Sequence, residues 1–128
     1  MRSLIRCAIV TATAAVVMST AIGSASAQVG APYIGDGYSN NVHAVWCVQH
    51  LVNDYRRAAG KPAIPEDNLW GPQTRNAVVD FQANTDNTGA IDGVVGPLTG
   101  RGLLNYDGTD IYAGHGYCFG FLPTPPGF

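Results

Sequence analysis

The sequence predicts a mainly α protein, a small three-helix bundle with long loops and an irregular C-terminal extension pinned by a disulfide. Three observations lead to this fold class. An amphipathic run covers residues 42–59. A Gly-Pro pair stands where each of two further helices would begin, at 71–72 and 96–97. Two cysteines, Cys47 and Cys118, remain once the N-terminal segment is set aside.

The first 27 residues have the order of a secretory signal peptide. Arg2 and Arg6 precede an uncharged apolar run, and the small residues 25–27 supply a cleavage site before Gln28. The alternative is a membrane anchor, but the run is short and rich in Ala, Ser and Thr for crossing about 30 Å of hydrocarbon. We therefore expect residues 1–27 to be removed, with no stable membrane anchor, and the rest to be secreted, either extracellular or associated with the cell wall.

The chain that follows is short and acidic. Removing Arg2 and Arg6 from the seven basic residues leaves five against nine acidic ones, a formal charge of −4 over 101 residues. This balance disfavours nucleic acid, whose binding depends on neutralising phosphates, and it disfavours anionic membrane surfaces. The length fits one small domain, which we expect to be a monomer.

The first helix is predicted after a glycine-rich lead-in, residues 28–39, which shows no helical period. Asn40 and Asn41 stand at a good position for an N-cap. Apolar residues then recur at spacings of three and four, which predicts one amphipathic helix. After it, Gly60 can take the left-handed position and Pro62 blocks continuation.

Two further helices are expected after the Gly-Pro pairs. Proline at the first helical position costs nothing, because its missing N–H would have no partner there. The helix that starts at Pro72 fades into the turn-forming residues 84–87. The helix that starts at Pro97 runs through Leu103 and Leu104, although two glycines weaken it by about 1 kcal/mol each relative to alanine: Gly100 and Gly102.

An acidic turn precedes each Gly-Pro pair, so one longer motif occurs twice, at 67–74 and 92–99. Each copy reads Asp, a residue that accepts positive φ, two hydrophobic residues, Gly, Pro, any residue and Thr. We interpret this motif as a way of starting a helix, which makes its Gly-Pro pairs structural.

The C-terminal extension, residues 106–128, loses the helical pattern. It is rich in Gly, Pro and aromatic residues, and we expect a loop or short hairpin that ends in a polyproline-like tail. An even number of cysteines in an exported chain predicts a disulfide between Cys47 and Cys118. The aromatic side chains either pack under this disulfide, which is the commoner arrangement, or form a ligand platform.

The segment from Val45 to Leu104, within a predicted domain at 40–105, resembles the three-helix peptidoglycan-binding domain of bacterial cell-wall hydrolases. The matching residues are both copies of the repeated motif and the helical pairs Val48-Gln49, Ala77-Val78 and Phe81-Gln82. Asn68 stands where the family usually has glycine. The resemblance implies three helices and noncovalent binding of peptidoglycan, through its glycan strand or its stem peptide, without catalysis.

We expect the ligand in a shallow groove between the loops that precede the second and third helices. Trp70 is the aromatic candidate, and it either packs in the core or faces the ligand. The polar candidates are Asp67, Asn68, Arg75 and Asp92. For Asp67 and Asp92 there is an alternative, in which each carboxylate accepts hydrogen bonds from the backbone of its own turn.

Catalysis is disfavoured by the arrangement of the reactive residues. His43 and His50 are separated by about 10 Å of helical rise, too far to share one zinc ion without a third element. A catalytic thiol would need a histidine base, and His43 and His115 are the candidates, but nothing around either cysteine supplies the third group that would orient this base. We expect no catalytic residue, no metal and no cofactor. The alternative function is an interaction protein with the same fold that binds or inhibits another exported protein, such as a cell-wall hydrolase.

Overall fold

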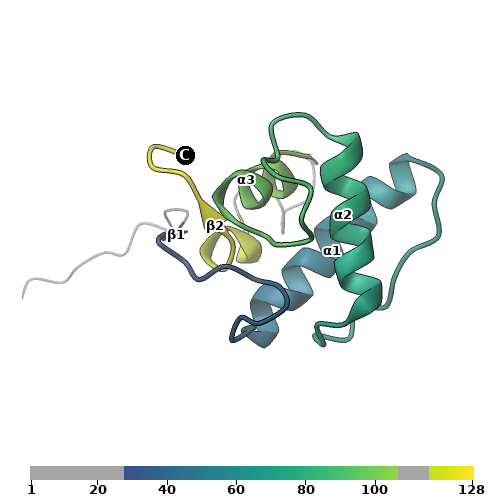
Figure 1. Ribbon diagram of the computed structural model, residues 1–128, viewed down its shortest axis with the longest axis horizontal. Coiled ribbons are helices and arrows are strands. Elements are labelled where there is room, and N and C mark those ends of the chain that lie inside the picture. Colours follow the sequence, from purple (N-terminus) through teal and green to yellow (C-terminus); the bar gives the residue numbers. More distant parts are fainter. Residues whose placement is uncertain (1–27, 107–115) are drawn as a thin grey trace, which may run out of the picture.

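The structure, a computed structural model, describes residues 28–106 and 116–128. In these residues the elements follow in the order β1 (Gln28–Val29), α1 (Val42–Ala58), α2 (Pro72–Asn84), α3 (Pro97–Tyr106), the 3-10 helix η1 (Tyr117–Gly120) and β2 (Pro123–Thr124). The predicted mainly α fold with three helices is confirmed (Figure 1). The expected signal peptide, residues 1–27, lies outside the described residues. None of the described helices is long and apolar enough to cross a membrane.

Helix α1 begins and ends where its sequence predicts. The side chain of Asn41 accepts hydrogen bonds from two backbone N–H groups of the first turn, at 2.9 and 3.3 Å. Gly60 adopts a φ of 69° after the last turn. The N–H groups of Gly60 and Lys61 donate to carbonyls of that turn at 3.1 and 2.7 Å, the paired bonds of a Schellman motif. Both ends of the helix are therefore satisfied locally.

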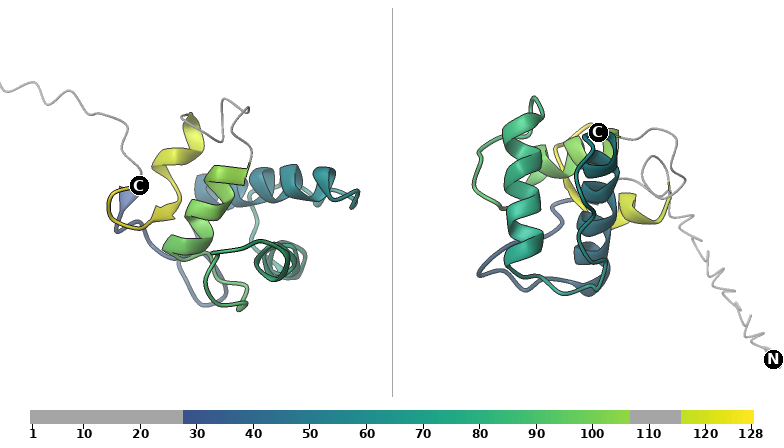
Figure 2. Two further views of the ribbon diagram at one scale, coloured as in Figure 1. Left: turned by 90° about the horizontal axis from the view of Figure 1, so that it is seen from above. Right: turned by 90° about the vertical axis from the view of Figure 1, so that its right-hand side faces the viewer.

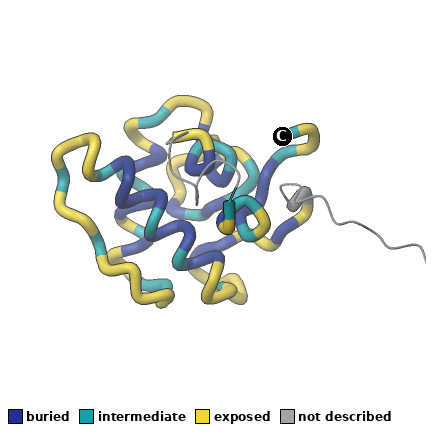
Figure 3. Tube along the Cα trace, turned by 180° about the vertical axis from the view of Figure 1, so that it is seen from behind, coloured by how far each residue is buried: buried dark blue, intermediate teal, exposed yellow. Residues whose placement is uncertain are grey.

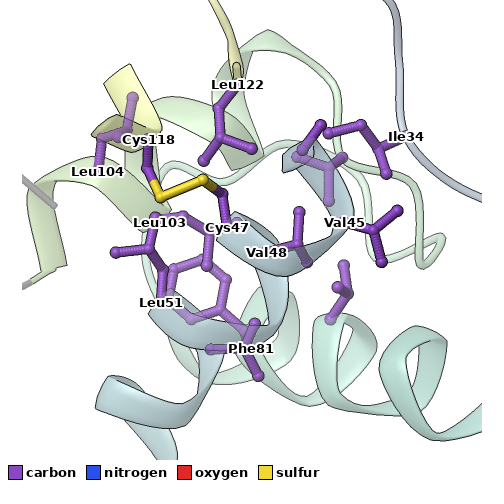
Figure 4. Packing of buried hydrophobic residues seen from close by; sticks show 14 of the residues in the cluster. Ile34, Val45, Cys47, Val48, Leu51, Phe81, Leu103, Leu104, Cys118 and Leu122 are labelled. Carbon is purple, nitrogen blue, oxygen red and sulfur yellow. A yellow bond between two sulfur atoms is a disulfide. The ribbon is translucent and has the colours of Figure 1, made fainter. Parts of the chain in front are cut away.

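Helix α1 is the central element, because it contacts α2, α3 and η1. Figure 2 shows α1 and α2 side by side in its right-hand view. The buried stretches follow the helices, whereas the connections between them are largely exposed (Figure 3). Phe81 of α2 and Leu103 of α3 are both 0% exposed and pack in one cluster with Leu51 of α1 (Figure 4). Burying a side chain of this size contributes about 1.5–3 kcal/mol.

The lead-in before α1 packs against the core. Ala31 and Ile34 are buried, and Ile34 forms an isolated antiparallel bridge with Val95, with N–H to O distances of 3.1 and 2.8 Å. Strand β1 pairs in parallel with β2, with Gln28 opposite Pro123 and Val29 opposite Thr124. The two ends of the described chain are thereby joined on one side of the bundle (Figure 1).

For the described residues of the C-terminal extension, the structure excludes one of two alternatives, the short hairpin, and contradicts one expectation, the polyproline-like tail. The extension forms no hairpin among these residues, because β2 pairs with β1 from the other end of the chain. Its tail is not polyproline-like, since Gly127 has a φ of 83° and the N–H of Phe128 turns back to the carbonyl of Pro125 at 3.4 Å. Polyproline geometry needs a φ near −75°.

The predicted disulfide is confirmed. Cys47 of α1 and Cys118 of η1 are bonded, with their Cα atoms 5.4 Å apart and both residues fully buried. Beyond η1, β2 lies directly on α3 at Gly100, where a Cβ would come within 2.0 Å of the carbonyl oxygen of Pro123. The helix-weakening glycine is therefore required for close packing of the extension.

Candidate functional site

A buried glutamine organises the turn that precedes α2. Gln49 is 1% exposed, and its side-chain nitrogen lies within hydrogen-bond distance of three acceptors. These are the carboxylate of Asp67 at 2.9 Å, the carbonyl of Leu69 at 3.0 Å and the hydroxyl of Thr74 at 3.0 Å. Its side-chain oxygen accepts from the N–H of Asn68 at 3.0 Å. One side chain of α1 thus holds the turn and the first residues of α2 together.

The turn that precedes α3 repeats this construction. Gln82 is 4% exposed, and its side-chain nitrogen lies 3.3 Å from the carboxylate of Asp92, 2.9 Å from the carbonyl of Val94 and 3.0 Å from the hydroxyl of Thr99. Its oxygen accepts from the N–H of Gly93 at 2.9 Å. The repeated sequence motif therefore corresponds to a repeated structure, in which each helix supplies the glutamine for the next turn.

Both turn aspartates accept hydrogen bonds from the backbone of their own turns. Oδ1 of Asp67 accepts from the N–H of Leu69 at 3.0 Å, and Oδ1 of Asp92 accepts from the N–H of Val94 at 2.9 Å. The hydrogen bond from Gln49, followed by that from the Leu69 backbone, lowers the pKa of the Asp67 carboxyl below its usual value. The structure thus shows the alternative in which each carboxylate accepts a hydrogen bond from the backbone of its own turn, and one oxygen of each carboxylate is used in this way.

The positive φ expected within each turn is also present. Asn68 has a φ of 65° and Gly93 a φ of 74°. Asparagine tolerates this conformation better than most residues with a side chain. It therefore places an amide at a position where a glycine would present none, and the residue is exposed.

Trp70 and Arg75 meet at a residue that the sequence did not single out, Asp36 of the lead-in. The indole N–H of Trp70 donates to Oδ1 of Asp36 at 2.8 Å, and Nε of Arg75 lies 3.3 Å from Oδ2. Nη2 of Arg75 also lies 3.4 Å from the carbonyl of Asp92. Trp70 is half-buried against the core. Its indole ring therefore packs against the core, while its N–H donates a hydrogen bond to Asp36 at the surface.

The lead-in lies against both turns. Asp36 contacts the first turn through Trp70, whereas a Cβ on Gly35 would meet Val94 of the second turn at 3.3 Å. Hollows are present beside each turn. One of about 240 Å³ is bordered by Gln49, Asp67, Leu69, Trp70 and the start of α2. Another of about 380 Å³ is bordered by Asp92, Val94, Leu98, Tyr33 and residues 125–126.

The five predicted site residues thus form one connected surface with different roles. Asp67, Asn68 and Trp70 belong to the first turn, and Arg75 links that turn to the backbone at Asp92. Two kinds of residue were missed. Asp36 gave no local sign, because its partners are distant in the sequence. The two glutamines did give one, since each directly follows a core residue on its helix, Val48 or Phe81.

Among the described residues, no group of three or more His, Cys, Asp and Glu side chains could hold a metal ion. His115 lies outside the described residues. No protein-family model, curated protein or solved structure significantly matches the chain.

Proposed function

We propose that this chain is a secreted, non-catalytic module that binds bacterial peptidoglycan noncovalently. The observation that carries the proposal is the pair of glutamine-held turns. The residues that make up these turns, Gln49 with 67–74 and Gln82 with 92–99, are those on which the resemblance to peptidoglycan-binding domains rests. Turns fixed by buried hydrogen bonds present their exposed groups in one geometry, which reduces the ordering cost of binding.

The edge of the first turn offers the groups that such a ligand requires. Leu69 is 68% exposed, and Trp70 borders the adjoining hollow of about 240 Å³. The Asn68 side chain has no hydrogen-bond partner among residues 28–106 and 116–128. An amide both donates and accepts, so it suits the hydroxyl, acetamido and peptide groups of peptidoglycan, while the apolar residues suit its C–H surfaces. We place the binding site at this edge.

Sedimentation with purified peptidoglycan sacculi tests the proposal. The chain, expressed with its own N-terminal segment and purified without reductant, is expected in the pellet with the sacculi and in the supernatant without them. In Asn68→Gly, glycine adopts the same φ of 65° without strain, and the side chain with its amide is removed. We expect this variant to bind about 2- to 10-fold more weakly, the effect of one lost hydrogen bond. Wild-type protein that stays in the supernatant at low salt would refute the proposal.

The second candidate is an interaction protein that binds another exported protein. One observation favours it, because the hollow beside the second turn has mostly apolar borders, including Tyr33, Leu98, Pro125 and Pro126. Leu98 and Ile91 are also exposed, at 43% and 60%. With an exported cell-wall hydrolase as the probe, this candidate predicts that Leu98→Ser abolishes capture of that enzyme and leaves sedimentation with sacculi unchanged.

A further inference from the structure

We propose that the chain has a second binding subsite, an aromatic platform formed by His43 and Trp46 of α1 and Tyr117 of η1, which takes the ring of an N-acetylated amino sugar. The inference rests on the proposed function, because it assigns the glycan strand, and not only the stem peptide, to this protein. The platform was not among the sequence-predicted site residues. Tyr117 belongs to the extension, for whose aromatic residues the sequence left two alternatives, packing beneath the disulfide or forming a ligand platform.

The platform rings fix one another. Tyr117 meets Trp46 edge-on, with ring centroids 5.9 Å apart and an interplanar angle of 76°. It meets His43 in the same way, at 6.0 Å and 69°, and its hydroxyl is hydrogen-bonded to Nδ1 of His43. Phe121 stacks on His43 at 5.3 Å. Edge-on and stacked pairs at these distances are favourable, so the rings are held in place before any ligand arrives.

The platform borders a hollow of suitable size and chemistry. Its volume is about 390 Å³, within the range of small-ligand sites, and Glu66 and Asn68 complete its border. A pyranose ring has a face of C–H groups that packs on an aromatic ring. Its hydroxyl and acetamido groups need donors and acceptors beside that ring, which a carboxylate and an amide provide. An apolar base with a polar rim therefore fits a sugar better than a purely apolar ligand.

Asn68 connects the platform to the turn site. It borders the platform hollow, whereas its neighbours Asp67 and Leu69 border the hollow of the first turn. The two hollows are thus on either side of one residue. A polymer with repeated sugar rings can occupy both hollows at once. A single stem peptide bound at the turn would need only the hollow of the first turn.

The disulfide joins the two halves of the platform. Cys47 directly follows Trp46, and Cys118 directly follows Tyr117. The bond therefore ties together two rings that come from segments 71 residues apart. Tyr117 is nevertheless 43% exposed and His43 is exposed as well. Rings whose only role was to pack under the disulfide would be buried.

The two tryptophans of the chain allow the subsites to be observed separately. In ¹⁵N-labelled protein, the indole N–H resonance of Trp46 reports the platform and that of Trp70 reports the turn site. We would titrate the oxidised protein with chitotetraose, an oligomer of N-acetylglucosamine that has no stem peptide. We expect a saturable shift of the Trp46 resonance.

Tyr117→Ala should weaken this binding about 5- to 10-fold, the effect of losing one aromatic contact. The matched control is Tyr38→Ala, which removes a tyrosine of similar exposure, 45%, that does not border the platform hollow. It should leave the affinity unchanged. The wild-type titration decides the matter even if Tyr117→Ala fails to fold.

The outcomes separate this inference from the proposed function. A Trp46 resonance that does not move at millimolar chitotetraose overturns the platform, even when the protein sediments with sacculi. Equal affinities of wild type and folded Tyr117→Ala overturn it as well. A Trp46 shift in a protein that fails to sediment with sacculi supports the platform as a saccharide site and refutes only the peptidoglycan proposal.

Discussion

The side-chain nitrogen of Gln49 lies 2.9 Å from a carboxylate oxygen of Asp67, and this contact holds the turn that leads into α2. We predict that Gln49→Leu lowers the free energy of unfolding by at least about 2 kcal/mol, because it leaves the Asn68 N–H and the buried hydroxyl of Thr74 without this partner. Urea unfolding monitored by circular dichroism measures the loss. Gln73→Ala, at an exposed position of α2, is the control and should change stability by less than about 0.5 kcal/mol. A Gln49→Leu variant as stable as this control would contradict the role given to the glutamine.

The same contact predicts how stability depends on pH. Hydrogen bonds from Gln49 and from the Leu69 backbone lower the pKa of Asp67 below its usual 3.8 in the folded protein. Ionised Asp67 therefore stabilises the fold above about pH 4, and this contribution is lost as the pH falls through the folded-state pKa. A carboxyl-detected NMR titration should place Asp67 below 3.8 in the wild type and closer to 3.8 in Gln49→Leu. An Asp67 that titrates at or above 3.8 in the wild type is inconsistent with this arrangement.

Gly100 allows β2 to lie on α3. We predict that Gly100→Ala destabilises the protein by about 3 kcal/mol or more, although alanine favours helices, because its Cβ would lie 2.0 Å from the carbonyl oxygen of Pro123. Gly120→Ala is the control, since a Cβ there meets nothing within 4 Å. Thermal unfolding of the two variants makes the comparison. If Gly100→Ala proved neutral or stabilising, the close packing of β2 on α3 would be refuted.

The disulfide closes a long loop and should contribute strongly to stability. For a separation of 71 residues, loop entropy corresponds to about 4 kcal/mol. We predict that reduction followed by alkylation lowers Tm by about 15 °C or more for a domain of this size. Alkylation places blocking groups on two buried sulfur atoms, which could itself destabilise the fold. The double variant Cys47→Ala/Cys118→Ala removes the bond without such groups and is therefore the control for alkylation. An identical melting curve before and after full reduction would show that the bond does not constrain the chain.

Local sequence patterns predicted the helices accurately. Asn41, Gly60 and the Gly-Pro pairs act within a few residues of the helix ends that they define, so their effects can be read from the sequence alone. The repeated turns were predicted for the same reason, including the positive φ of Asn68. The Cys47–Cys118 bond was predictable because only two cysteines follow the segment expected to be cleaved.

Contacts between distant parts of the chain were not predictable in this way. The pairing of β1 with β2, the bridge from Ile34 to Val95 and the contact of Asp36 with Trp70 each join segments with no shared pattern. The glycine-rich lead-in was predicted to be a linker or an extended segment, because its buried hydrophobic residues, Ala31 and Ile34, are too few to form a period. For the aromatic residues of the extension, the sequence left open packing under the disulfide or a ligand platform, because their partners on α1 are distant in the sequence.

The most direct test of the central claim is a binding isotherm on purified sacculi, measured for the wild type and Asn68→Gly side by side. Asparagine and glycine both adopt the positive φ found at residue 68, so the two proteins should fold alike and have equal circular dichroism spectra. The account predicts saturable binding by the wild type and binding about 2- to 10-fold weaker by Asn68→Gly. Absence of saturable binding by the folded, oxidised wild-type protein would contradict it.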